Sequence, residues 1–178
     1  LLTRTNYHVI SIDNHSNSGP DSYARVKQIT NKDFEVLNFD LCDSSMLQSK
    51  LAGYRDIEAI IHFAAFKSVP DSMHDPVLYY DNNLPSLTNL LQWCKDKKVA
   101  KFIFSSSCSV YGNPDKLPVT EETPLKKAES PYGHTKQVCE DILRFFCMAE
   151  PWFNTVLLRY FNPVGAHPSG LNGEVPLS

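Results

Sequence analysis

The chain has 178 residues, of which 42% are hydrophobic and 21% charged, and its formal net charge is −3. This length favours one domain with a hydrophobic core of its own. The charge balance is not that of a nucleic-acid-binding protein, no apolar run approaches the roughly 20 residues that cross a bilayer, and the N-terminal residues lack a secretion pattern. We therefore expect neither nucleic acid nor membrane as a partner.

Short apolar runs alternate with longer helical patterns along the chain. Strands are predicted at residues 9–12, 36–39, 57–63, 102–104 and 155–161, and helices at 21–30, 44–51, 76–97 and 131–149. This alternation indicates βαβ units and an α/β fold with a parallel sheet. The third run is almost wholly apolar, as in a strand buried on both faces. Pro85 should kink or break the third helix.

The remaining stretches, residues 113–131 and 162–178, are polar and proline-rich, and both are predicted loops. The chain begins with Leu1-Leu2, which would suit the last turn of a helix, and it ends within a loop. We therefore expect both ends to be arbitrary cuts.

Five cysteines are spread along the chain without a Cys-x-x-Cys pair: Cys42, Cys94, Cys108, Cys139 and Cys147. Their odd number argues against a disulfide framework. We expect reduced thiols in a cytoplasmic protein. We expect no metal site, because no cluster of histidines and cysteines has the spacing of metal ligands.

Tyr132 and Lys136 are four residues apart, so on a helix they share one face. A free tyrosine, with a pKa of about 10, is a poor base, but a nearby ammonium would stabilise the phenolate and lower that pKa. The pair alone is more often the edge of an amphipathic helix. Its context favours catalysis, because the strand that runs into Ser105-Ser106-Ser107 places hydroxyl groups where α/β sheets bind ligands.

Two other polar residues close predicted strands. Asp13 ends the first strand, where a carboxylate can bind ribose hydroxyls and favour NAD over NADP, or can simply serve as a turn or capping residue. His62 lies at the end of the apolar third strand, and we interpret it as a core histidine rather than a ligand.

The longer motifs resemble the extended short-chain dehydrogenase/reductases, and within them the nucleotide-sugar epimerases. The resemblance covers nearly the whole chain and rests on Ile12–Asn14, His62–Lys67, Tyr79–Asn83, Phe104–Gly112, Ser130–Lys136 and Leu158–Gly170. It implies a Rossmann-like, doubly wound parallel sheet. The family's first strand and glycine-rich phosphate loop are not found in the sequence, so residues 1–178 are expected to be a partial NAD-binding domain with a gap in its sheet and without the C-terminal substrate domain.

The resemblance implies roles residue by residue. Tyr132 would be the catalytic acid/base, Lys136 would tune it and bind the nicotinamide ribose, and Ser107 would help to move the proton. The NAD contacts would be Asp13 and Asn14, with the loop through Ser18, at the adenosine ribose, Asp40 and Leu41 at the adenine, and Phe63, Ala64, Ala65, Lys67, Asn82 and Phe161 along the cofactor. The substrate would contact Lys67, Ser107, Tyr132 and Asn162.

The implied reaction interconverts UDP-glucose and UDP-galactose by inverting C4 through a transient 4-keto sugar, with NAD retained. A homodimer of the full-length protein, formed by the helices around 80–97 and 132–149, is also implied. Other UDP-sugars, carrying N-acetylhexosamine or glucuronate, stay open as substrates, as does an inactive remnant. A 4,6-dehydratase is disfavoured, because such enzymes carry an acidic Thr-Asp-Glu type triplet where residues 106–109 read Ser-Ser-Cys-Ser.

Two positions depart from the family pattern. Pro70 replaces a usual glycine, and Pro85 interrupts a helix that usually lacks proline, so either could shift the Lys67 loop or Asn82. Because the phosphate loop and the substrate domain are missing, we expect the 178-residue piece alone to bind NAD poorly and not to turn over.

Overall fold

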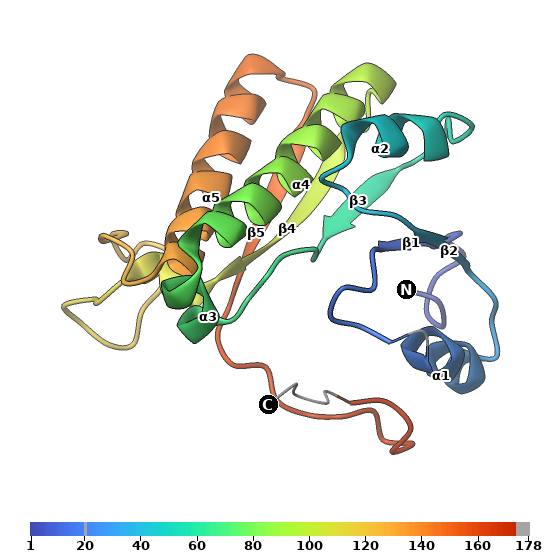
Figure 1. The fold of residues 1–178 in the computed structure, drawn as a ribbon, viewed down its shortest axis with the longest axis horizontal. Helices are drawn as coiled ribbons and strands as arrows, with labels where there is room; N and C mark the ends of the chain where they lie inside the picture. The colour runs from blue at the N-terminus through green and yellow to red at the C-terminus, as the bar shows by residue number, and fades with distance from the viewer. Residues whose placement is uncertain (20, 174–178) are drawn as a thin grey trace. The chain divides into compact units, whose positions relative to one another are not determined.

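The computed structural model describes residues 1–19 and 21–173 and shows helices alternating with parallel strands (Figure 1). The described residues form two compact units, one from residues 1–40 and 162–173 and the other from residues 41–161. The predicted α/β fold is confirmed. Residues 174–178, the end of the predicted C-terminal loop, lie outside the described residues. Within residues 1–19 and 21–173, no helix is long and apolar enough to cross a membrane.

The smaller unit is built on one βαβ element. Strand β1 (Ile10–Asp13) and strand β2 (Glu35–Asn38) pair in parallel, and helix α1 (Asp21–Thr30) connects them. Helix α1 carries Asp21 in its first turn and Lys27 in its last, which complements the helix dipole. The ring of Tyr23 on this helix lies 6.0 Å, between centroids, from the ring of buried Phe34.

The larger unit has a three-stranded parallel sheet in the order β3-β4-β5, with bounds Ala59–His62, Lys101–Ser107 and Asn154–Tyr160. Its helices are α2 (Ser44–Lys50), α3 (Val69–His74), α4 (Pro76–Lys97) and α5 (Pro131–Ala149), and a 3₁₀ turn, η1 (Cys108–Tyr111), follows β4. Helices α4 and α5 lie side by side on one face of this sheet (Figure 1). Phe102 and Phe104 of β4 are buried in the core on that side, with Leu87 and Leu143 from the helices.

The strands of the described residues form two separate ladders, β1-β2 in the smaller unit and β3-β4-β5 in the larger one. The expectation that the third strand is buried on both faces is wrong. His62 is buried, whereas the side chain of Ile61 is 37% exposed. On the same sheet Val156 and Leu158 of β5 are also exposed. Within the described residues, the helices of the larger unit cover one face of its sheet, and the exposed side chains show that the other face is uncovered.

Capping residues fix where the two long helices begin. Asp75 accepts a hydrogen bond from the Leu78 N–H at the start of α4, and the Ser130 hydroxyl accepts one from the Gly133 N–H at the start of α5. A proline follows each cap, at a position where its missing N–H costs little. The predicted start of each helix, at residues 76 and 131, is therefore confirmed.

Pro85 does not break α4, which continues through all of its 22 residues. Proline cannot donate to the carbonyl four residues earlier, that of Asp81. The Cys42 thiol lies 3.9 Å from this oxygen and 3.3 Å from the Asn82 carbonyl oxygen, so it partly replaces the lost donor.

Helix α3 was not predicted, although the sequence carries a signal for it. The Ser68 hydroxyl caps the helix by accepting a hydrogen bond from the Asp71 N–H, and Pro70 lies in the first turn. The departure at Pro70 is therefore accommodated as the beginning of a short helix.

Candidate active site

Ser107, Tyr132 and Lys136 come together in the larger unit, at the carboxyl end of β4. Ser107 is the last residue of β4, and the next residues turn into η1. Tyr132 lies in the first turn of α5, and Lys136 follows one turn later on the same face. The side chains of Ser107 and Tyr132 are hydrogen-bonded. The structure thus joins three residues that the sequence singles out.

The Lys136 side chain is almost fully buried. Its Nζ donates a hydrogen bond of 2.8 Å to the Ser105 carbonyl oxygen, and lies 4.8 Å from the centroid of the Phe104 ring and 5.9 Å from that of Tyr132. Burial disfavours the charged form and lowers the pKa of Lys136 to about 8. An ammonium has three donors, so two more can serve hydroxyl groups of a ligand.

The pKa of Tyr132 is raised above its ordinary value, chiefly because burial disfavours the phenolate. The hydrogen bond with Ser107 and the charge of Lys67 oppose this shift, and Cys108 adds to it. The expectation that Lys136 lowers the pKa of Tyr132 is therefore wrong for this structure. The cation that favours the phenolate is Lys67, from the loop after β3.

Ser109 orients the Ser107 hydroxyl and was not predicted from the sequence. Its backbone N–H and its own hydroxyl both donate to Ser107 Oγ, at 3.2 and 2.9 Å. Since Ser107 Oγ accepts two hydrogen bonds, its own proton is left to point towards Tyr132. This arrangement suits the predicted relay.

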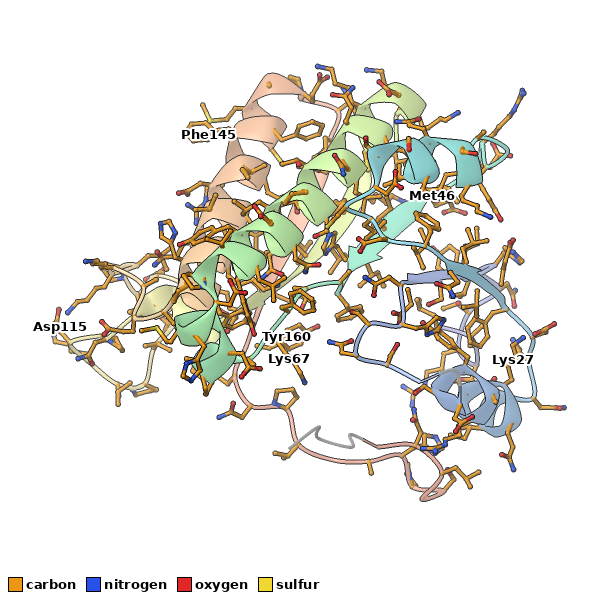
Figure 2. The ribbon with its side chains drawn as sticks, in the orientation of Figure 1. Lys27, Met46, Lys67, Asp115, Phe145 and Tyr160 are labelled. Atoms are coloured by element: carbon orange, nitrogen blue, oxygen red, sulfur yellow. The ribbon has the colours of Figure 1, made fainter. Side chains whose placement is uncertain are left out.

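In the loop after β3, Phe63 and Ala64 are exposed to solvent and Ala65 is half-buried. Lys67 of the same loop is also exposed (Figure 2). Asn83 of α4 holds this loop by both ends of its side-chain amide. Its Oδ1 accepts from the Phe66 N–H at 2.8 Å, and its Nδ2 donates to the Phe66 carbonyl at 3.1 Å. These two hydrogen bonds hold the backbone of the loop at Phe66 in a fixed position relative to α4.

The same amide connects the loop to the catalytic helix. Asn83 Nδ2 also donates to Thr135 Oγ1 at 3.1 Å, and Thr135 in turn donates to the Tyr132 carbonyl at 2.7 Å. The predicted cofactor residue Asn82 donates to Asn83 Oδ1 at 2.9 Å. Asn83 and Thr135 are both buried, and neither was predicted as a site residue.

Two predicted residues lie elsewhere in this unit. Leu41 is buried after β2, and Asn89 Nδ2 holds its segment to α4 by donating to the carbonyls of Leu41 and Cys42, each at 3.0 Å. Phe161 is exposed just after β5 and lines a cavity of about 530 Å³ together with Tyr111 and Arg159.

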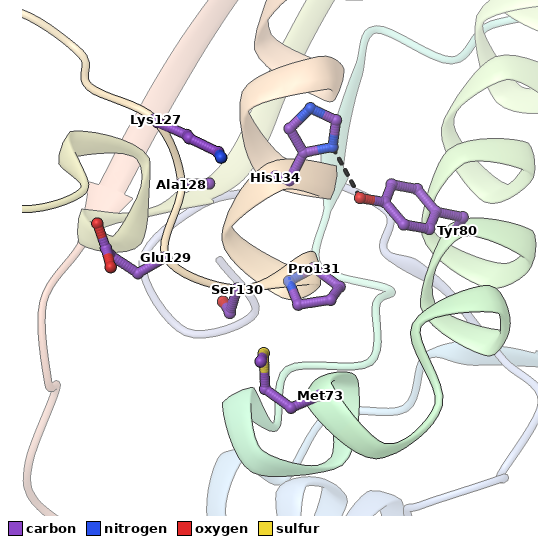
Figure 3. A pocket seen from close by; sticks show the side chains of 8 residues that line it. All are labelled: Met73, Tyr80, Lys127, Ala128, Glu129, Ser130, Pro131 and His134. Carbon is purple, nitrogen blue, oxygen red and sulfur yellow. Dashed lines mark hydrogen bonds between the residues drawn. The ribbon is translucent and has the colours of Figure 1, made fainter.

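A second, shallower pocket, of about 350 Å³, lies beside the beginning of α5 (Figure 3). Across it the Tyr80 hydroxyl and His134 Nδ1 form a 2.8 Å hydrogen bond that links α4 to α5. Ser107, Tyr132 and Lys136 line neither of these two pockets.

The remaining predicted residues, Asp13, Asn14, Asp40 and Asn162, belong to the smaller unit. The Asp13 carboxylate accepts hydrogen bonds of 2.8 Å each from the His15 N–H, the Ser18 hydroxyl and the Tyr23 hydroxyl. Burial raises the pKa of Asp13, but these hydrogen bonds outweigh it and hold the pKa below its usual value. Asp13 is thus a fixed negative charge at the end of β1. Beside it, Asn14 Nδ2 donates to Asp40 at 2.9 Å, and Asn162 is exposed.

All five cysteines are free thiols. No group of three or more histidine, cysteine or acidic side chains suited to a metal ion is found within residues 1–19 and 21–173.

Comparison with known proteins places this geometry in a family. The model of the NAD dependent epimerase/dehydratase family matches residues 1–176. The chain is 45% identical to the UDP-glucose 4-epimerase of Haemophilus influenzae over 168 residues, which are 94% of this chain and 49% of that protein. It therefore spans about half the length of the curated relatives it matches.

Solved structures of epimerases also resemble this chain. UDP-glucose 4-epimerase from Bifidobacterium longum, in complex with NAD+ and UDP, superposes with a TM-score of 0.93 at 48% identity, covering 97% of this chain and 51% of that one. The UDP-Glc/GlcNAc 4-epimerase from Campylobacter jejuni gives 0.82 at 35% identity, covering 90% of this chain and 47% of that one. The chain belongs to the NAD dependent epimerase/dehydratase family.

Proposed function

We propose that residues 1–178 are the partial NAD-binding domain of a UDP-glucose 4-epimerase, which interconverts UDP-glucose and UDP-galactose. The observation that carries the proposal is the convergence of Ser107, Tyr132 and Lys136 at the end of β4. The similarity to UDP-glucose 4-epimerases, at 45% and 48% identity, supports the choice of reaction.

The residues present fit NAD in chemical character. The Asp13 carboxylate stays ionised because three hydrogen bonds lower its pKa, and an anion at this strand end favours ribose hydroxyls over a 2′-phosphate. In the larger unit the buried Lys136 ammonium can donate to a second ribose. Phe63, Ala64 and Ala65 supply an apolar edge and small side chains along which a cofactor can lie.

NAD, when bound, supplies an acceptor for the hydride of the sugar's C4 and later returns it. The chain's own residues move the proton. Tyr132, as the phenolate, accepts the proton of the 4-hydroxyl through or beside Ser107, and donates it back to the 4-keto oxygen when the hydride returns. Burial raises the pKa of Tyr132, and the charge of Lys67 and the hydrogen bond with Ser107, which oppose this shift, make the phenolate more accessible.

The test uses the complete protein that contains this chain. UDP-galactose and NAD are supplied, and UDP-glucose is measured by coupled oxidation. We expect turnover by the parent protein and a loss of kcat of about 10²- to 10⁴-fold in Tyr132→Phe, the range of general acid–base catalysis, with KM little changed. Normal turnover by Tyr132→Phe would exclude the proposed acid/base.

A broader sugar range is a second candidate. It is favoured by the likeness to the Campylobacter jejuni enzyme, whose name includes both UDP-Glc and UDP-GlcNAc. The same assay with UDP-N-acetylgalactosamine separates the two readings, since a protein specific for UDP-galactose leaves it unconverted.

We further propose that the complete protein is a cytoplasmic homodimer that uses α4 and α5. In support, Phe145 and Met148 on α5 have side chains 68% and 76% exposed, and Phe145 projects away from the helix (Figure 2). Val77 and Leu78 are exposed on α4. Five free thiols suit a reducing compartment. Light scattering should give a dimer for the parent protein and a monomer for Phe145→Glu.

A further inference from the structure

A buried charge cluster lies one turn beyond Lys136 on α5. The Glu140 carboxylate is fully buried, and its hydrogen bonds come from charged and polar side chains. It accepts from the Ser106 hydroxyl at 2.6 Å, from Arg159 Nε and Nη2 at 2.9 and 2.8 Å, and from Arg144 Nη2 at 3.0 Å. Hydrogen bonds to an ionised group in a dry site are the strong ones.

These partners come from different elements. Ser106 lies on β4 and Arg159 on β5, so the carboxylate connects α5 to two strands of the sheet. Arg159 extends the connection, because its Nη1 donates to the Tyr111 hydroxyl of η1 at 3.1 Å and its guanidinium stacks 4.9 Å from that ring. Arg144 differs, because it lies on α5 itself and joins no other element.

The cluster completes a pattern along one face of α5. Tyr132, Lys136 and Glu140 are spaced four apart, and each contacts one of the three serines that end β4. Tyr132 pairs with the Ser107 side chain, Lys136 with the Ser105 carbonyl, and Glu140 with the Ser106 hydroxyl. Sliding α5 along β4 would break all three contacts at once.

We propose that Glu140, through Ser106 and Arg159, is a positioning residue that sets the register of α5 on β4 and so holds Tyr132 against Ser107. Glu140 touches neither reacting group, and it acts through the helix and the strand that carry them. The readout in turnover rests on the proposed epimerase function. A displacement of about 1 Å at a reacting group can lower the rate about 100-fold, so the register of α5 on β4 affects turnover.

Two matched variants of the complete protein separate positioning from simple stability. Ser106→Ala removes the hydrogen bond between Glu140 and β4 and leaves the Arg159 pair intact. Arg144→Ala removes a hydrogen bond to the same carboxylate from within the helix. We expect Ser106→Ala to lower kcat about tenfold with KM changed less than twofold, and Arg144→Ala to leave both unchanged. Equal losses in the two variants, or no loss in Ser106→Ala, would overturn the proposal.

A double variant controls for loss of activity through misfolding. Replacing Glu140 and Arg159 together by leucine removes both charges and keeps the volume apolar, an exchange that many folds tolerate. We expect the double variant to fold, with a melting temperature near that of the parent protein, and to lose kcat at least as strongly as Ser106→Ala. A folded double variant with full kcat would contradict the assigned role.

A readout that needs no turnover keeps this proposal distinct from the proposed function. The Tyr132 ring, labelled with ¹³C and assigned by its loss in Tyr132→Phe, is titrated by NMR. Ser106→Ala should shift the Tyr132 titration measurably, since the distances to Ser107, Cys108 and Lys67 change, whereas Arg144→Ala should leave it unchanged. If the parent protein does not epimerise, the proposed function fails; if the Tyr132 titration is the same in all variants, the positioning role fails.

Discussion

The Lys136 ammonium donates its hydrogen bond to a main-chain carbonyl, that of Ser105, at 2.8 Å, and not to a carboxylate. A neutral partner cannot compensate for the burial of a charge as an anion would, so the pKa of Lys136 falls to about 8. The Lys136 ammonium is therefore easier to deprotonate than a lysine exposed to water, although it stays mostly charged at neutral pH.

Lys136→Met tests how much the buried Lys136 ammonium lowers the free energy of unfolding. The folded-state pKa of Lys136 lies below its unfolded value, so between about pH 8 and pH 10.5 the unfolded chain binds more protons and stability rises with pH. The parent protein should gain unfolding free energy relative to Lys136→Met across this window, and the variant should lose turnover. Urea titrations at several pH values measure the difference; one that is independent of pH would contradict the assignment.

Thr135→Val and Thr135→Ser form a matched pair. Valine has the shape of threonine but breaks the path from Asn83 to the Tyr132 carbonyl, whereas serine keeps the hydroxyl. Valine also leaves a buried amide hydrogen without its partner, which costs about 1–3 kcal/mol. We expect Val to weaken NAD binding and lower kcat, and Ser to restore both in part. Equal behaviour of the two variants in calorimetry and turnover would show that the hydroxyl has no role.

His62 should make the protein sensitive to acid. Burial lowers its pKa to about 4, and the nearby Lys136 charge adds to the shift. Neither ring nitrogen has a hydrogen-bond partner among the described residues; the backbone of Ser86 opposes the shift only weakly. The folded pKa lies below the unfolded one, so stability falls as the pH drops from about 6.5 towards 4, by about 3 kcal/mol. His62→Leu should remove this part of the acid transition in melting curves between pH 7 and pH 4.

Gly112→Ala should be strongly destabilising. Gly112 has a φ of 60°, and a Cβ there would lie 2.5 Å from the Lys127 carbonyl oxygen. The strained backbone and the clash together should cost about 2 kcal/mol or more. Gly53→Ala is the control, since a Cβ at Gly53 meets no atom within 4 Å. Thermal melts of the two variants that fall at the same temperature would show that the turn after η1 relaxes freely.

The sequence alone determined the order of the elements and the residues at the strand ends. Apolar runs bounded by polar residues are local, so the five strands and four of the helices could be predicted, and Ser130-Pro131 marked the start of α5. The spacing of Tyr132 and Lys136 follows from the helix repeat. Helix α3 had a local signal as well, the Ser68 cap with Pro70, which the prediction did not use.

Only the tertiary structure decided how these residues act on one another. Asn83 holds a loop 17 residues away and a helix 52 residues away, and Glu140 joins residues 34 and 19 positions distant. The direction of the Tyr132 pKa shift also reversed the expectation, since burial raises this pKa more than Ser107 and Lys67 lower it. Burial and contacts between distant residues arise when helices pack on a sheet, and no local pattern encodes which polar groups that packing brings together.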